Sequence, residues 1–202
     1  MSGSITNTSA APGYLQQIDT NVKGNVALTN LLQMAVIGIT GLDPTLVRPR
    51  WQPQPPTQPP VTTDWCAIGI ETFDLYDYPQ IIHDGVNQVD NLYRLVRINL
   101  LTSFYGPNAS ALASALRDGF YISQNFGTLA QYGVRFRSAE NIIYISELIN
   151  SQYVPRVDLF LNFTHMIQRT YAIENLVGAE VDLSVDFPLP NGSTNVVLIT
   201  EE

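Results

Sequence analysis

PRVDLFLNFTHMIQR, residues 155–169, decides the fold, because apolar and polar side chains alternate along it. A period of two maintained over this length is typical of an antiparallel strand with one packed face and one face in water. Residues 176–187, LVGAEVDLSVDF, repeat the pattern. The expected packed face of the first strand consists of Val157, Leu159, Leu161, Phe163, His165 and Ile167, opposite Arg156, Asp158, Asn162, Thr164 and Gln168.

Further strands are expected upstream of this stretch. Residues 64–76 and 91–104 are rich in β-branched and aromatic side chains and predict two long strands. Residues 77–90 contain Asp84-Gly85 and predict a short strand followed by a turn.

Two main helices are predicted from apolar side chains at helical spacing. The first spans about residues 22–39 and ends at Gly41. The second opens at Gly106-Pro107, with proline in the first helical position. A shorter helix is expected near residues 128–131. The inner face of the second helix is expected to be Ala109, Leu112, Ala113, Leu116 and Phe120.

The strands are grouped rather than alternating with helices, so we predict an α+β fold. An antiparallel β-sheet carries the two main helices on one face. Residues 1–20, rich in Ser, Thr and Asn, predict a flexible N-terminal arm. Residues 21–187 predict a single domain, and residues 188–202 a C-terminal extension containing a loop and a short edge or exchanged strand.

A long proline-rich loop, residues 43–62 (DPTLVRPRWQPQPPTQPPVT), interrupts the domain. Proline cannot continue a helix or occupy a central strand, so polyproline II geometry is expected. The loop is either a stiff surface connection or a docking arm anchored by its tryptophan. The docking interpretation assigns an interface to Arg50, Trp51, Pro53, Pro55, Pro56, Pro59 and Pro60.

Charge is scarce and acidic in this chain. Charged residues make up 14% of the 202 residues, against about 25% in typical domains, which favours a surface partly covered by neighbouring subunits. Lys and Arg number 10 against 18 Asp and Glu, for a net charge of −8, and they form no basic stripe for nucleic-acid binding. The N-terminus resembles no signal peptide and no segment predicts a membrane span, so synthesis in a cytoplasm is expected.

No catalytic, metal-binding or cofactor-binding motif is recognised in the sequence, so we predict a protein that is not an enzyme. His165 falls on an apolar strand face, where a core histidine is expected. His83 and Asp84 resemble a base with an orienting acid, but adjacent strand residues point to opposite faces. Cys66 lies in an apolar strand and is expected to be a buried, inert thiol.

Several segments stand out together in the sequence. They are RWQPQPP (50–56), QPP (58–60), DWCAIG (64–69), SFYGPNA (103–109), LRDGF (116–120) with QN (124–125), and ELIN (147–150) leading to YVPRVD (153–158). Together these segments resemble the phage neck terminator proteins, which are tail terminators of long-tailed phages. The resemblance covers roughly residues 25–180, and its specific part is the Pro-Trp stretch.

The resemblance implies a small α+β subunit of a sixfold ring in the virion neck. Such a ring caps the tail tube, ends its growth and contacts head-completion, adaptor or stopper proteins, with sheath or collar as further partners. Genomic DNA passes through without sequence-specific binding, and synthesis occurs in the bacterial host cytoplasm. We add the hypothesis that the acidic face of residues 176–187, Glu180, Asp182 and Asp186, lines the lumen.

Two alternatives remain open from sequence. The first is another structural protein of the same particle, such as a head-completion, stopper or baseplate protein. The second is a small hydrolase or carbohydrate-binding domain, which would need a cleft joining His83 or His165 to acids on neighbouring strands.

Overall fold

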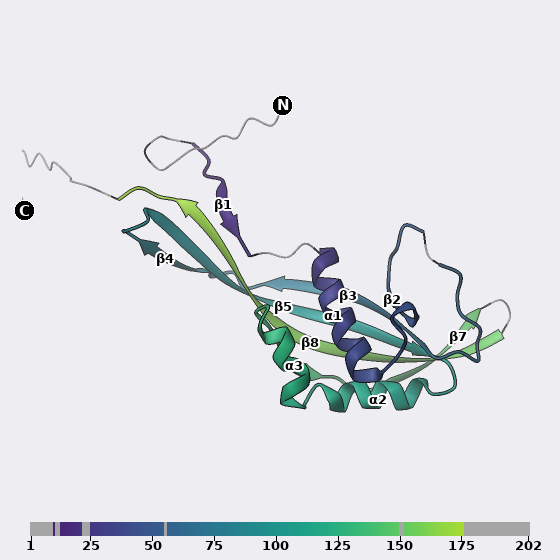
Figure 1. Ribbon diagram of the computed structural model, residues 1–202. Coiled ribbons are helices and arrows are strands. Elements are labelled where there is room, and N and C mark those ends of the chain that lie inside the picture. Colours follow the sequence, from purple (N-terminus) through teal and green to yellow (C-terminus); the bar gives the residue numbers. More distant parts are fainter. Residues whose placement is uncertain (1–9, 11–12, 22–24, 55, 150–151, 176–202) are drawn as a thin grey trace, which may run out of the picture.

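One long twisted sheet runs the length of the molecule, and helices cover one of its faces (Figure 1). The computed structural model describes residues 10, 13–21, 25–54, 56–149 and 152–175. Within that part, the sheet has 8 strands in the order β1-β8-β5-β3-β2, with β4 beside β5 and with β6 and β7 beside β8. The predicted α+β class is confirmed.

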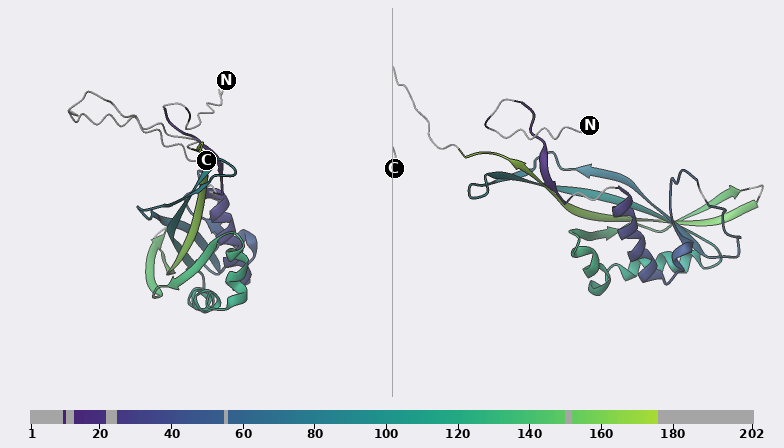
Figure 2. Two further views of the ribbon diagram at one scale, coloured as in Figure 1. Left: turned by 90° about the vertical axis from the view of Figure 1, so that its left-hand side faces the viewer. Right: turned by 45° about the horizontal axis from the view of Figure 1, so that its top comes forward.

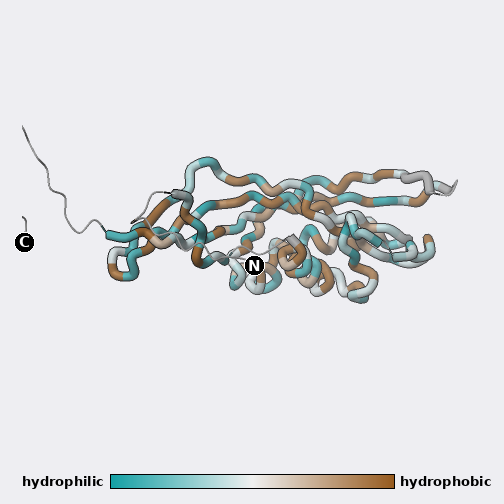
Figure 3. Tube along the Cα trace, turned by 90° about the horizontal axis from the view of Figure 1, so that it is seen from above, coloured by the Kyte–Doolittle hydropathy of each residue, from teal (hydrophilic) through white to brown (hydrophobic). Residues whose placement is uncertain are grey.

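The centre of the sheet is the antiparallel pair β5 (Val89–Tyr105) and β8 (Gln152–Ala172). The alternation predicted for residues 155–169 is confirmed, because its six apolar-face residues are each at most 3% exposed. Both strands extend beyond the predicted ranges, since the ladder continues from Val89↔Ala172 to Tyr105↔Arg156. Figure 3 shows hydrophobic and hydrophilic positions alternating along the strands.

The other strands attach to the two outer edges of this pair. β3 (Trp65–Leu75) and β4 (Gln80–Asp84) pair with β5, as the sequence predicted for residues 64–76 and 77–90. β8 is lined on its other edge by β1 (Gln17–Thr20), β6 (Val134–Ala139) and β7 (Ile143–Ile149).

Two regions have more structure than the sequence predicted. Gln17–Thr20, assigned to the N-terminal arm, forms β1 against β8. The proline-rich loop contains a short 3-10 helix, Pro44–Leu46, and strand β2 (Val47–Pro49). β2 is parallel to β3, so the sheet is mixed rather than wholly antiparallel. Pro49 is compatible with β2 because this strand lies at the edge of the sheet.

Three helices in the described part pack on the same face of the sheet: α1 (Asn25–Thr40), α2 (Ala109–Gly119) and α3 (Ser123–Ala130) (Figure 2). Their apolar sides join the strands in one core that includes Leu32, Leu116 and Phe163. Phe120, the C-cap residue of α2, contacts Phe136 and Phe163, with its ring centroid 5.1 and 5.4 Å from theirs. No helix in the described residues is long and apolar enough to cross a membrane.

The prediction that Pro107 occupies the first position of the second helix is wrong. The helix begins at Ala109, with Asn108 as its N-cap residue. The Asp64 carboxylate accepts hydrogen bonds from the Asn108 backbone N–H and side-chain amide, both at 2.8 Å. These bonds, with a left-handed Gly106 (φ 101°), hold Gly-Pro-Asn in a turn before the helix.

The face of β8 predicted to be wet is partly buried, so that expectation is wrong for two of its residues. Asp158 is 3% exposed and Thr164 is 9% exposed. A second small cluster covers this side of the sheet near Asp158, where Ala67, Tyr105 and Val154 pack with Trp65. The side of the sheet opposite the helices is called the far face below.

Candidate assembly surface around Trp51

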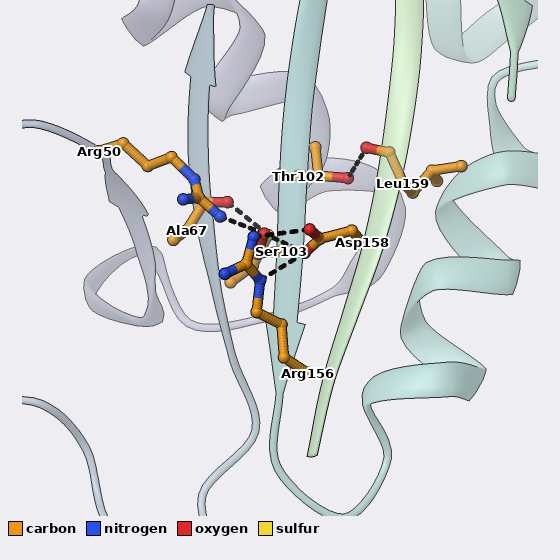
Figure 4. A network of polar contacts seen from close by, with 8 residues as sticks. Arg50, Ala67, Thr102, Ser103, Arg156, Asp158 and Leu159 are labelled. Carbon is orange, nitrogen blue, oxygen red and sulfur yellow. Dashed lines mark hydrogen bonds and ion pairs between the residues drawn. The ribbon is translucent and has the colours of Figure 1, made fainter. Parts of the chain in front are cut away.

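The loop that follows β2 places Arg50 on the far face. The Arg50 backbone N–H donates to Ile68 O, which continues the β2–β3 pairing by one residue. The Arg50 guanidinium crosses β3 and donates to the Ser103 hydroxyl on β5 (Figure 4). Arg50, which was predicted to contact another protein, therefore directs its side chain toward its own sheet.

Ser103 connects Arg50 to a buried ion pair on β8 (Figure 4). The Ser103 hydroxyl donates to the Asp158 carboxylate. Arg156 donates to both oxygens of that carboxylate, from Nε to Oδ1 at 2.7 Å and from Nη2 to Oδ2 at 2.6 Å. The network spans β3, β5 and β8 and anchors the start of the proline-rich loop. Asp158 and Ser103 gave no sequence signal of this role, because their partners lie far away in the chain.

Trp51 is held outward by an unusual backbone conformation. Its φ is 55°, in the left-handed region that few non-glycine residues adopt, and its side chain is 68% exposed. The indole lies against Gly69 of β3, where an added Cβ would be only 2.6 Å from Trp51 Cζ3. The strand glycine therefore makes room for the ring. A glycine inside a strand pattern can indicate such a close approach, but the sequence did not identify its partner.

The base of the loop is fixed while its outer part faces solvent. The Arg48 guanidinium donates to Thr45 O at 2.9 Å and to Thr57 O at 2.8 Å, and its carbon lies 6.0 Å from the Trp65 ring centroid. Trp65 in turn stacks on Tyr105 at 4.2 Å. Of the predicted interface residues, Pro53, Pro56 and Pro60 are exposed, Pro59 is half-buried, and Pro55 lies outside the described residues.

Trp51 borders a groove of about 620 Å³ and a second one of about 330 Å³. The larger groove lies between the start of α1, the loop and strand β3, and Ile70 and Phe73 contribute to its lining. The smaller groove includes Pro56 and Trp65. An exposed indole ridge between two grooves is suited to contact with another protein, because aromatic side chains contribute most strongly when a partner covers them. We call Trp51 with Pro53, Pro56 and Pro60 the Trp51 surface.

The remaining candidate residues occupy structural positions. His165 is 3% exposed, as expected for a core histidine, and its Nδ1 lies 3.1 Å from Gly133 O, whereas its buried Nε2 has no hydrogen-bond partner among the described residues. Cys66 is fully buried, and burial raises the pKa of its thiol, so the predicted buried thiol is confirmed. The described residues contain no group of three or more His, Cys, Asp or Glu able to hold a metal ion. Glu180, Asp182 and Asp186 lie outside the described residues.

His83 pairs with Asp90 rather than with the adjacent Asp84. Its Nδ1 lies 2.7 Å from Asp90 Oδ1, and its Nε2 lies 2.7 Å from Asn175 Oδ1. The Asn175 amide nitrogen donates to Gly85 O at 2.7 Å, which fixes the orientation of the amide. Asp84 instead accepts from the turn at Val86 and Asn87. Because both ring nitrogens face acceptor oxygens, the folded protein favours the doubly protonated ring.

We expect the contact between His83 and Asn175 to weaken as pH rises. The hydrogen bond to Asp90, then the bond to Asn175, raise the pKa of His83 above its ordinary value of 6.5, with the charges of Asp90 and Asp84 adding to the shift. The contact is complete below the unfolded pKa and is lost as pH rises through the higher folded pKa. NMR titration should give a His83 pKa above 6.5, lowered more by Asp90→Asn than by Asn175→Ala. A pKa at or below 6.5 in the native protein would contradict this arrangement.

The family of the chain follows from comparison with known proteins. A model of the family described as phage neck terminator protein matches residues 26–186. This range contains the core, the proline-rich loop and the turn at Gly106. No curated protein matches the chain. The match covers most of the 202 residues, so the chain belongs to the phage neck terminator family. Membership implies a structural role in the neck of the virion.

Proposed function

We propose that this protein is a tail terminator whose copies form a closed ring. The ring caps the tail tube, ends its growth and joins it to the head-completion proteins, with DNA passing through the centre. Six copies are the expected number. The family match supports the location in the neck, and the distribution of exposed apolar side chains supports the ring.

That distribution is the observation that carries the proposal. The sheet extends beyond the helices at both ends (Figures 1 and 2). At the β4–β5 end, Tyr78 is 94% exposed and Val86 is 93% exposed. At the β7 end, Tyr144 is 70% exposed and Tyr153 is 76% exposed. A ring of identical subunits needs two different surfaces that contact head to tail, and exposed apolar ends of one elongated subunit meet that requirement.

Particles made without this gene test the proposal. Full heads beside detached tails, some of them over-long, are expected by electron microscopy. Tails of normal length that fail to join heads would move the protein to the head-completion or stopper side of the neck. Normal particles would contradict the proposal and reopen the search for a catalytic or carbohydrate-binding role. Complementation with the wild-type gene is the control for each outcome.

Gly69→Ala tests the Trp51 surface without truncating the indole. The added methyl would collide with the exposed Trp51 ring, so the ring must move. Since that ring is free to shift, the free energy of unfolding should change by less than about 1 kcal/mol. In complementation, both Gly69→Ala and Trp51→Ala should reduce the fraction of joined heads and tails. Met34→Ala, which truncates another side chain that is 68% exposed, is the matched control. Normal joining with both variants would rule out an assembly role for this surface.

The lumen assignment of Glu180, Asp182 and Asp186 remains part of the proposal. Acidic groups around a channel repel phosphate and let DNA slide. Replacing all three with asparagine should leave assembly intact and slow DNA ejection, which single-particle ejection assays measure at several ionic strengths. An unchanged ejection rate at low salt, where repulsion is strongest, would argue against a lumen position.

A further inference from the structure

The outer edge of β3 is open over residues 70–75. β2 pairs with β3 only from Val47↔Cys66 to Pro49↔Ile68, and the left-handed Trp51 then turns the chain away. No other described strand pairs with that edge.

The pairing of β3 with β5 shows which backbone groups of β3 point toward the unpaired edge. The Tyr76 N–H donates to Leu95 O, so every second residue before it also bonds to β5. Phe73 and Leu75 therefore direct their backbone N–H and C=O groups outward.

The unpaired edge of β3 is suited to pairing with another strand. An exposed edge is usually blocked by lysine, proline or an inward charge, because unpaired backbone groups invite pairing. The bulge between Ile70 and Thr72 twists the strand, but the residues after it remain extended and carry neither lysine nor proline. Their one charged side chain, Asp74, is on the face opposite Phe73 and Leu75. Phe73 is 36% exposed and Leu75 is 46% exposed. Pairing with a strand would satisfy the backbone and cover both side chains.

The groove beside Trp51 defines where such a strand would lie. Its lining combines residues 68–73 of β3 with Val26 and Thr29 of α1 and with Trp51 of the loop. α1 covers the helix side of the sheet, whereas Trp51 covers Gly69 on the far face. The open edge therefore lies between two walls. A strand added to β3 would have one side against α1 and the other against the indole.

The chain itself supplies a segment of the required type. Residues 176–187 alternate between an acidic face and the apolar face Val177, Ala179, Val181, Leu183, Val185 and Phe187. An amphipathic strand needs both a sheet partner and an apolar cover, because an isolated strand is not stable in water. The described chain reaches this segment at the tip of the β4–β5 hairpin. Ala172 lies opposite Val89, the first residue of β5, and Asn175 is bonded to His83 and Gly85 of the turn.

We propose that residues 176–187 of one copy add as a strand to the open edge of β3 in the next copy. β8 has passed the first residue of β5 at that point, so a continuing strand would find no further β5 residue of its own copy to pair with in the described part of the sheet. The apolar face of the segment covers Phe73 on the α1 side of the groove, and its acidic face lies on the far face, beside the exposed Trp51. This inference rests on the proposed ring and specifies how one subunit joins the next.

Photo-crosslinking in purified virions tests the inference. Benzoylphenylalanine replaces Phe73 in the full chain, and Tyr121, which is 56% exposed after α2 and lies in neither proposed contact, receives the same probe as a control. Irradiation should give an adduct of twice the subunit mass from the Phe73 probe. The partner should be the tryptic peptide that begins at Thr170, because residues 170–202 contain no Lys or Arg. Fragment spectra should place the bond within residues 176–187, and the Tyr121 probe should not give this adduct.

Two single substitutions give a matched check within the segment. Leu183→Asp places a charge on the apolar face and should lower the Phe73 adduct at least about tenfold, because an unpaired charge is costly to bury. Ser184→Asp adds the same charge to the acidic face and should leave the adduct unchanged. Equal loss with both variants would show that the face of the segment does not matter and would overturn the proposal.

The outcomes separate this inference from the proposed function. An adduct of single-subunit mass would mean that the segment folds back on its own β3, and would overturn the contact between copies. An adduct to a different protein, or no adduct in particles that contain the chain, would overturn the inference and leave the terminator role intact. Absence of the chain from the particles would overturn both.

Discussion

Replacing Asp158 with alanine is expected to lower the free energy of unfolding by about 3–5 kcal/mol. The carboxylate is 3% exposed and accepts hydrogen bonds from Arg156 and Ser103. Without it, the Arg156 guanidinium, whose side chain is only 19% exposed, loses the carboxylate to which it donates two hydrogen bonds. Removing one partner of a buried pair leaves an uncompensated charge, and that penalty exceeds the net contribution of the intact pair.

Urea denaturation followed by circular dichroism measures the effect. Asp77→Ala, which removes an exposed carboxylate, is the matched control and should change the free energy by less than about 0.5 kcal/mol. Because the network holds Arg50, the Asp158 variant should also loosen the Trp51 surface and reduce joining of heads and tails at temperatures where the fold persists. Loss of less than about 1 kcal/mol would mean that the pair is not buried in solution.

Gly106→Ala is expected to lower the free energy of unfolding by about 2–4 kcal/mol. Gly106 has a φ of 101°, which alanine adopts only with strain. An added Cβ would also lie 2.7 Å from the Asp64 Cα and 2.7 Å from the Thr63 carbonyl oxygen. Both obstacles are backbone atoms, so relief requires the turn between β5 and α2 to move. The motif SFYGPNA, part of the resemblance to the family, thus has a steric explanation.

Gly127→Ala is the matched control for this substitution. Gly127 lies in α3 and has nothing within 4 Å of its added Cβ, so alanine there should stabilise the protein by about 0.5–1 kcal/mol. Thermal unfolding of the two variants should therefore shift in opposite directions. Equal shifts would show that the turn at Gly106 is more open than described.

The features that could be predicted from sequence depend on neighbours along the chain. The alternation around Leu161 predicts one packed face of a strand, and the helical spacing around Leu116 predicts one packed face of a helix. Leu161 and Leu116 are both buried, as expected. The predicted wet face failed at Asp158 because its carboxylate bonds to Ser103, 55 residues earlier in the sequence, which in turn accepts from Arg50 in the proline-rich loop. Periodicity cannot report a contact between segments so distant.

The candidate site was predictable only in part for the same reason. The Pro-Trp stretch indicated the surface, and Trp51 is exposed there. Gly69 did not reveal its partner Trp51, and the open edge of β3 had no local signal, because each depends on where the loop leaves the sheet. The pairing of His83 with Asp90 likewise depends on the register of the hairpin, whereas the sequence offered only its neighbour Asp84.

The β5–β8 ladder has a mechanical consequence. These strands run antiparallel beside each other from Val89↔Ala172 to Tyr105↔Arg156, along the long axis of the subunit (Figure 1). Tension that pulls the two strands past each other along this axis loads their hydrogen bonds in shear, so many bonds share the force and must break together. Peeling one strand sideways would instead break the bonds one after another. A subunit built on this ladder is therefore stiffest along its length, the direction that joins its two exposed apolar ends.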